Sequence, residues 1–298
     1  MTDRNSNHHP KTEATARSAS ARRRSPWPLA VIAALFIIVP FLTWYGTWFG
    51  RSLKDATIEE YLRDEKPRHV QHALSEIEKR VAAGDGGAKR WYPQIVKLAG
   101  HASPDVRLTV AWVMGVDTRA EEFHAELLRL AEDREPIVRR NAALSLVSFG
   151  DPRSLKELRA MLKPYTVVSS FEGRAETVLS EGSKVNREAM LVRVRSKEGE
   201  SLEARAPLDG TIEKALLREG DEVRAGQEIF VLAPDVRSVE DALVGLRRLG
   251  EQEDLTEVER YARGVPGMPS RTKELAAQTA EAIKRRVEQK RGSSNSGH

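Results

Sequence analysis

The chain contains a repeat of 32 residues, which restricts its possible folds more than any other feature. When residues 91–114 are placed over residues 123–146, the apolar side chains of the two segments coincide. The second half of each copy carries the same signature, in which Pro104, Val106 and Arg107 correspond to Pro136, Val138 and Arg139. The apolar spacing is helical, and proline is tolerated in the first turn of a helix. Each copy therefore predicts two helices joined by a turn.

A helix pair of this size cannot bury its apolar face alone, so successive pairs are expected to stack. The proline–valine–arginine signature, followed by small and apolar residues, resembles that of HEAT repeats of the short, phycobilisome-lyase-like form. The resemblance implies an α-solenoid, which we place at residues 52–163 and 234–290.

One copy of the repeat is interrupted. Asp151 is expected to cap a helix that reaches Leu162, but the signature of the following helix returns only at Pro234, Val236 and Arg237. Residues 165–233 between them are short β-rich runs separated by glycine turns. We therefore predict a strand domain inserted between the two helices of one repeat, because insertions are tolerated at exposed turns whose ends lie close together.

The predicted strand domain has its own repeat, at an offset of 38 residues. Glu181-Gly182 corresponds to Glu219-Gly220, Val185 corresponds to Val223, and apolar runs follow in both copies. With the segments Ala206–Gly210 and Leu217–Gln227, this pattern resembles the biotinyl/lipoyl-like domain, or barrel-sandwich hybrid. The resemblance implies a cofactor-bearing lysine at the hairpin tip between the two halves.

In this chain the carrier-lysine position is occupied by Gly199. Lys197 lies nearby but lacks the neighbours that such domains place beside the modified lysine. We therefore expect an all-β domain without a covalent cofactor, and a carrier that uses Lys197 is the least favoured alternative.

An uncharged segment, Trp27–Phe49, precedes the repeats. As a helix it would be roughly 34 Å long, enough to cross a hydrocarbon core of about 30 Å. A cleaved signal peptide is the alternative, but the apolar stretch is longer than usual and no small-residue cleavage site follows it. The segment predicts a single membrane-spanning helix. Arginines at 22–24 predict that the N-terminus lies in the cytoplasm, because positive charge flanks the cytoplasmic end of a membrane helix. In a bacterium the span would lie in the inner membrane, and the chain after it would lie in the periplasm or outside the cell.

Composition argues against several classes of function. The net charge of +4 resides entirely in residues 1–26, which predict a disordered basic tail, so no nucleic-acid-binding face is expected on the folded part. The chain has no cysteine, which excludes thiolate catalysis and disulfides. His69 and His72 could share a helix face with Glu76 and are weak candidates for metal ligands, with a solvated polar face as the alternative. We expect no catalytic residue, metal or other cofactor.

The sequence thus predicts a multidomain α + β protein: one transmembrane helix and a HEAT-like α-solenoid interrupted by a lipoyl-like domain, followed by a loose tail at 291–298. Periplasmic adaptor (membrane-fusion) proteins also place an unmodified lipoyl-like domain behind an N-terminal anchor. This distant similarity implies a non-enzymatic scaffold or adaptor for envelope proteins in a transport or secretion complex. The connection at 194–202 is too short for the coiled-coil hairpin of such adaptors. The alternative is an accessory subunit or assembly factor of a membrane enzyme complex, for example a respiratory one.

Overall fold

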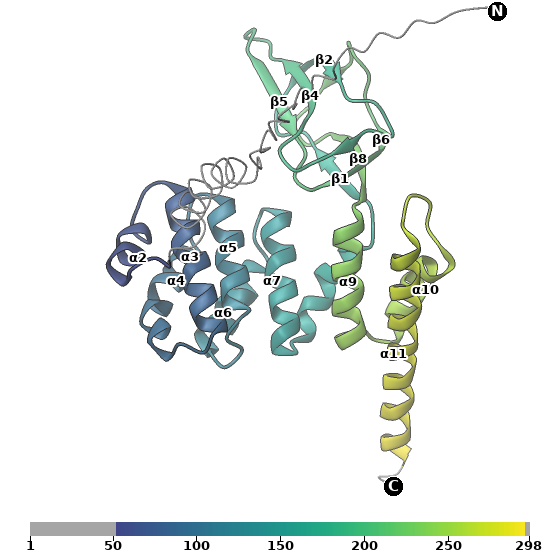
Figure 1. Cartoon of the computed structure of the whole chain (residues 1–298). Helices are drawn as coiled ribbons and strands as arrows, with labels where there is room; N and C mark the ends of the chain where they lie inside the picture. The colour runs from purple at the N-terminus through teal and green to yellow at the C-terminus, as the bar shows by residue number, and fades with distance from the viewer. Residues whose placement is uncertain (1–51, 296–298) are drawn as a thin grey trace, which may run out of the picture. The chain divides into compact units, whose positions relative to one another are not determined.

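The structure is a computed structural model that describes residues 52–295. Helices precede and follow a continuous set of strands (Figure 1). The helices are α2 (Asp55–Tyr61), α3 (Pro67–Ala82), α4 (Tyr92–Leu98), α5 (Pro104–Met114), α6 (Glu121–Leu130), α7 (Pro136–Phe149), α8 (Leu155–Met161), α9 (Val236–Leu249), α10 (Leu255–Arg263) and α11 (Ser270–Asn295), with 3₁₀ turns at Gly86–Trp91, Pro152–Ser154 and Gln252–Asp254.

The helices form antiparallel pairs, and the second helix of each pair packs against the second helix of the next. Helices α3, α5, α7, α9 and α11 therefore form one row, with the first helices α2, α4, α6, α8 and α10 beside them (Figure 1). The 32-residue repeat explains this stacking, because corresponding side chains meet between the layers. Trp91, at the end of the 3₁₀ turn before α4, and Phe123, on α6, occupy equivalent positions of the repeat, and both are buried in the same apolar core.

The strands are β1 (Tyr165–Val168), β2 (Gly173–Val178), β3 (Lys184–Val185), β4 (Met190–Arg195), β5 (Ser201–Arg205), β6 (Gly210–Ala215), β7 (Glu222–Val223) and β8 (Glu228–Pro234). They form two four-stranded antiparallel sheets with the orders β1-β8-β6-β3 and β5-β4-β2-β7. The 38-residue repeat maps β2, β3 and β4 onto β6, β7 and β8, so the two sheets have equivalent orders. Their inner faces share one apolar core that includes Val192, Val194, Ile229 and Phe230.

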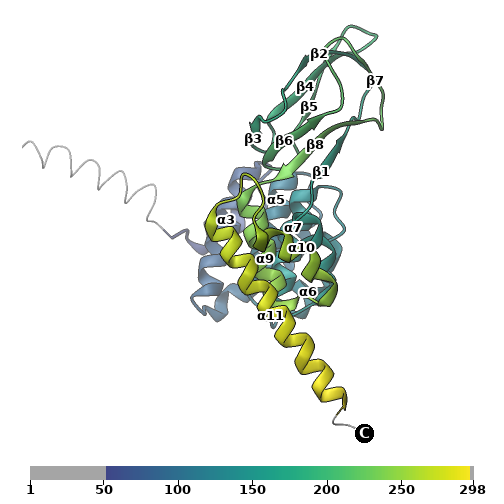
Figure 2. The same ribbon diagram turned by 90° about the vertical axis from the view of Figure 1, so that its right-hand side faces the viewer.

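The strands leave the helical array and return to it at one place, through β1 and β8 (Figure 2). Strand β1 pairs with β8, which sets Tyr165 opposite Leu232. Helices α8 and α9, on either side of the strands in sequence, share an apolar core that includes Leu158 and Leu246. A Cβ atom at Gly245 would lie 2.8 Å from the Leu158 side chain, so glycine permits this close approach.

Three sequence-based expectations differ from the structure. No helix among residues 52–295 is both long and apolar enough to cross a membrane, and the predicted span at 27–49 lies outside the described residues, as does the basic tail at 1–26. The membrane-spanning helix is therefore not supported. The expected barrel-sandwich hybrid is also wrong as a closed fold, because the sheets are open. Strands β3 and β7 each have two residues and a pairing partner on one side only.

The third difference is the C-terminal boundary. Helix α11 continues through Asn295, whereas a loose tail was expected from residue 291. The helix is tied to the rest of the chain as far as residue 291, because Arg286 donates to the carbonyl oxygens of Gly250 and Arg247, and Arg291 donates to the Gln252 side chain.

Candidate functional site

The signature arginines of the first two full repeats have the same structural role. Arg107 Nη1 donates to the carbonyl oxygens of His101 and Ala102, at 2.9 and 3.0 Å. Arg139 Nη1 donates to the carbonyl oxygens of Asp133 and Arg134, which are the equivalent positions, at 2.7 and 3.1 Å. Each arginine thus closes the loop that precedes its own helix.

The same guanidinium groups connect neighbouring repeats. Arg107 forms two hydrogen bonds with the Asp133 carboxylate, at 2.7 and 2.9 Å, and Arg139 lies 3.4 Å from the Glu157 carboxylate. Burial acts to raise the pKa of Asp133, but the hydrogen bonds from Arg107 and from the Glu135 N–H outweigh it and lower the pKa. These arginines therefore hold the stack together and do not form a binding site.

Arg237 carries the third copy of the signature, but its environment is different. Its side chain is 88% exposed, and its recorded ion pair is with Asp241, at 3.9 Å. The backbone five and six residues before it belongs to β8, which is paired on both sides within its sheet. No pre-helix loop is left for Arg237 to close, so the insertion has released this arginine from the role of Arg107 and Arg139.

The start of helix α9 is displaced for the same reason. Pro104 and Pro136 stand at the first position of their helices, whereas Pro234 ends strand β8 and is paired with Gly210. Helix α9 begins two residues later, with Asp235 as its N-cap. The Asp235 carboxylate accepts hydrogen bonds from the N–H groups of Arg237 and Ser238, at 2.9 and 3.1 Å.

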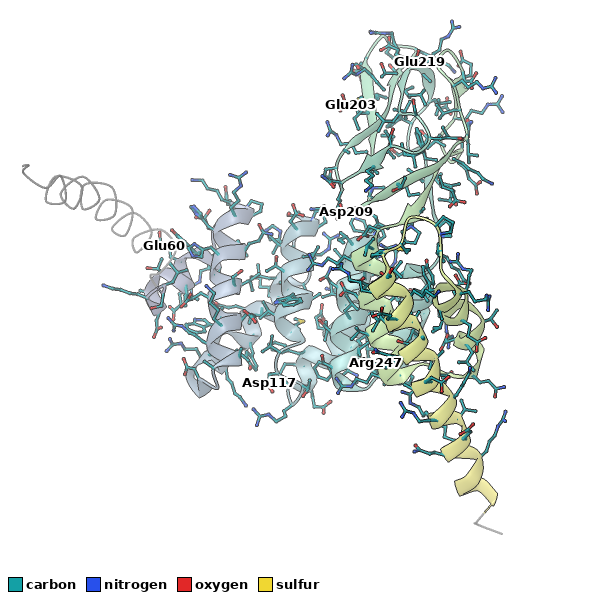
Figure 3. All side chains as sticks on the ribbon, turned by 45° about the vertical axis from the view of Figure 1, so that its right-hand side comes forward. Glu60, Asp117, Glu203, Asp209, Glu219 and Arg247 are labelled. Atoms are coloured by element: carbon teal, nitrogen blue, oxygen red, sulfur yellow. The ribbon has the colours of Figure 1, made fainter. Side chains whose placement is uncertain are left out.

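A cleft lies beside Arg237, between the row of second helices and the strand domain, with a volume of about 470 Å³. Asp209, on the β5–β6 loop that helps to line it, lies at the end of the strand domain nearest the helices (Figure 3). The lining residues come from three second helices, α8 and this loop: Leu108, Thr109, Trp112, Ile137, Arg140, Asn141, Leu144, Met161, Leu208, Asp209, Asp235, Arg237, Ser238 and Asp241.

Trp112 is the most unusual of these residues. It lies on α5 with 56% of its surface exposed, the highest value among the large exposed hydrophobic residues of the described chain. Its equivalent in the next repeat, Leu144, also lines the cleft but packs partly against the neighbouring apolar core. The sequence signal was the tryptophan itself, at the position where the next copy has Leu144. Aligning the copies by their shared apolar positions did not bring out this difference.

The cleft holds a buried cation that already has partners. Arg140 is 4% exposed, its Nε lies 3.7 Å from a Glu157 carboxylate oxygen, and its Nη1 donates to Ser238 Oγ at 3.3 Å. Burial lowers the pKa of Arg140 and raises the pKa of Glu157, while the opposite charge of each group opposes the shift of the other. Arg140 therefore serves as an internal tie between α7, α8 and α9.

The candidate metal ligands predicted from the sequence do not converge. His69 Nδ1 lies 2.6 Å from Asp64 Oδ2, and its ring stacks on Tyr61. His72 has a tilted contact with the same tyrosine, and Glu76 lies 3.6 Å from Arg80. Within residues 52–295 there is no group of three or more side chains from His, Cys, Asp and Glu placed to hold a metal ion.

A histidine–carboxylate pair elsewhere resembles part of a catalytic site, but the repeat explains it. His124 Nε2 lies 2.7 Å from Asp151 Oδ2, and one repeat earlier Tyr92 Oη donates to Asp117 Oδ2 at 3.0 Å. Each aspartate also accepts the N–H of the arginine two residues later, Arg153 or Arg119. The same structural hydrogen bond therefore occurs in both repeats, between the first helix of a pair and the turn that follows the second helix. The shared Asp-x-Arg sequence could have revealed it.

The carrier position of the strand domain is an ordinary hairpin end. Gly199 has a φ of +85°, which glycine adopts without strain, and lies between β4 and β5. The Lys197 side chain is 78% exposed, and its Nζ lies 3.9 Å from Glu172.

Comparison with known proteins identifies one segment of the helical part of the chain. Residues 92–170 match the family model described as HEAT repeats. The chain contains HEAT repeats. The matched segment runs from the start of α4 to just past β1 and includes the two signature arginines that close their loops.

Among solved structures, one similar chain is described as "Structure and function of a single-chain, multi-domain long-chain acyl-coa carboxylase". The match has 15% sequence identity and a TM-score of 0.23, and it covers 34% of this chain and 11% of that chain. This chain thus spans a small part of the length of that protein. No curated protein matches the sequence.

Proposed function

We propose that this protein is a non-enzymatic scaffold that binds a partner protein at the cleft between its HEAT repeats and its strand domain. The observation that carries the proposal is the exposure of Trp112 in this cleft. Leaving a tryptophan in water forgoes a large burial energy, and tryptophan is enriched among the residues that dominate protein–protein binding energy. A partner side chain placed against Trp112 would recover that energy.

The architecture supports this function. Stacked helix pairs present a continuous row of second helices, as repeat proteins do in their binding surfaces. The buried arginines and their carboxylates fix the spacing of that row, so the cleft is formed before a partner arrives. A preformed site loses less conformational entropy on binding than a site that must first become ordered.

For the strand domain we propose an origin among biotinyl/lipoyl-like domains, with the cofactor function lost and a structural role retained. The equivalent orders of its two sheets and the glycine at the hairpin end support this. Intact-mass measurement of the full-length chain from its native cells should give the unmodified mass. A mass increase that matches biotin or lipoate on Lys197 would contradict the proposal and restore the carrier alternative.

Location and partner class stay predictions. The sequence-based prediction is that the folded part lies in the periplasm of a bacterium, with envelope proteins of a transport or secretion complex as partners. An accessory role in a membrane enzyme complex stays open beside it. The cleft proposal depends on neither, because it concerns only the described residues.

Site-specific photo-crosslinking tests the proposed function. A benzoylphenylalanine placed at Trp112 should yield a discrete crosslinked product in the native cells. The matched control is the same group at Arg129, whose side chain is also 56% exposed but lies on the first helix α6. Equal labelling at the two positions, or no product at Trp112, would refute the proposal.

A further inference from the structure

The charge of the cleft indicates what kind of segment it can bind, provided that the cleft is the binding site proposed above. Three carboxylates line it: Asp209 on the β5–β6 loop, Asp235 at the N-cap of α9, and Asp241 one turn into α9. Arg237 is the exposed cation among the lining residues, and its Nε lies 3.9 Å from the Asp241 carboxylate. The other lining cation, Arg140, is buried and paired with Glu157. The accessible part of the cleft is therefore acidic.

An acidic partner would find no accessible counter-charge in the floor of the cleft. Arg140 is 4% exposed, so it would have to leave Glu157 and Ser238 to reach such a partner, and Glu157 would then keep only Arg139, at 3.4 Å. A basic group entering the cleft would compete with Arg237 for Asp241, while Asp209 and Asp235 also accept backbone N–H groups. The basic group would also offset the negative charge around Asp241. Burial raises the pKa of Asp241, Arg237 opposes this rise, and the nearby Asp235 and Glu240 carboxylates add to it.

The apolar lining adds a second requirement. Leu108, Trp112 and Ile137 lie on adjacent second helices α5 and α7, and each lines the cleft. A volume of about 470 Å³ accommodates a few side chains and is too small for a folded domain. The exposed Trp112 can also receive a cation over its ring, since tryptophan is the best aromatic partner for lysine and arginine.

We infer that the cleft binds a peptide segment of the partner protein that carries lysine or arginine next to an aromatic or branched apolar residue. The apolar side chain packs on Trp112 and the floor of the cleft, and the basic side chain lies among Asp209, Asp235 and Asp241. The strand domain thereby contributes one wall of the site through Asp209 and Leu208.

A displayed library of random peptides tests this assignment without knowledge of the partner. The library is selected on the full-length chain and depleted on the Trp112→Ala variant, which removes the indole from the cleft without adding a charge. We expect the enriched peptides to have net positive charge and at least one aromatic or branched residue beside a basic one. Enrichment of neutral or acidic peptides would overturn the inferred chemistry while leaving the proposed binding site intact. A library that yields nothing specific to the unmodified chain would also overturn the inference, whereas the proposed function is judged separately by the crosslinking at Trp112.

Synthesised copies of the enriched peptides then locate the charges that bind them. Replacing Trp112 by Ala should weaken binding about 30-fold, as for a central hot spot. The double variant Asp209→Asn/Asp241→Asn, which preserves side-chain shape, should weaken it about tenfold, and Arg237→Glu should strengthen it. The matched control is Glu132→Gln/Glu253→Gln, which removes two exposed carboxylates outside the cleft and should leave affinity unchanged. Equal effects of the two double variants, or weaker binding by Arg237→Glu, would show that the acidic lining does not select the peptide.

Discussion

Arg107→Met is the substitution that most directly tests how the HEAT repeats are held together. Methionine keeps an unbranched apolar stem of similar length, so packing along the stem is largely retained. The lost group is the guanidinium, which donates two hydrogen bonds to the Asp133 carboxylate and two to the carbonyl oxygens of His101 and Ala102. The change therefore removes the contact between adjacent repeats together with the two hydrogen bonds that close the loop before α5.

The expected cost follows from burial. The Arg107 and Asp133 side chains are 7% and 9% exposed, so the substitution leaves a carboxylate that is almost completely buried without its counter-ion. Removing one partner of a buried ion pair costs about 3–5 kcal/mol in the free energy of unfolding. Asp133 still accepts the N–H of Glu135, so we expect about 3 kcal/mol, the lower end of that range.

The measurement is urea unfolding of the full-length chain, followed by far-ultraviolet circular dichroism, with hydrogen exchange to localise the loss to α5, α6 and α7. Arg237→Met is the matched control because it changes the same signature position where the side chain is 88% exposed. We expect that control to change stability by no more than about 0.5 kcal/mol. Equal costs for the two variants, or a cost below about 1 kcal/mol for Arg107→Met, would refute the assigned role of the signature arginine.

Three further predictions concern the same contacts. Arg153 hydrogen bonds lower the pKa of Asp151 against burial, and Arg107 similarly outweighs the burial of Asp133. The contributions of these two carboxylates to the free energy of unfolding are therefore fully present above the ordinary aspartate pKa of 3.8 and are lost as pH falls through the lowered folded-state values. The urea concentration at half-unfolding should therefore fall on acidification below about pH 4. The fall should be less steep in Arg107→Met, which has lost the Asp133 contribution. Gly210→Ala should destabilise the strands by about 1–3 kcal/mol, because its Cβ would lie 2.6 Å from the Ala233 carbonyl oxygen; unchanged exchange in β6 and β8 would contradict this. Replacing residues 165–233 by a short turn should preserve the α8–α9 core, because β1 and β8 bring the two ends together, and loss of helical circular dichroism would show that the strands are required for that core.

The helical repeats could be predicted because their period directly records the stack. Trp91 and Phe123 align in sequence since both fill the same layer, and the family match confirms the HEAT repeats. The equivalent order of the two sheets likewise follows from the 38-residue repeat. Sheet closure did not follow, because β3 and β7 are too short to pair on both sides, and a sequence pattern does not give strand length at that precision.

The candidate site was largely beyond sequence analysis because it is formed by the break in the pattern. Within the repeat, Arg107 and Arg139 follow loops whose free carbonyl oxygens they bind. Arg237 has the same local sequence, but a strand precedes it, and the hydrogen bonds of the sheet leave it no such loop. Its exposure was therefore determined by the preceding residues and not by the signature itself. In an interrupted repeat, the first signature arginine after the insertion can thus lose its structural contacts and become exposed to solvent.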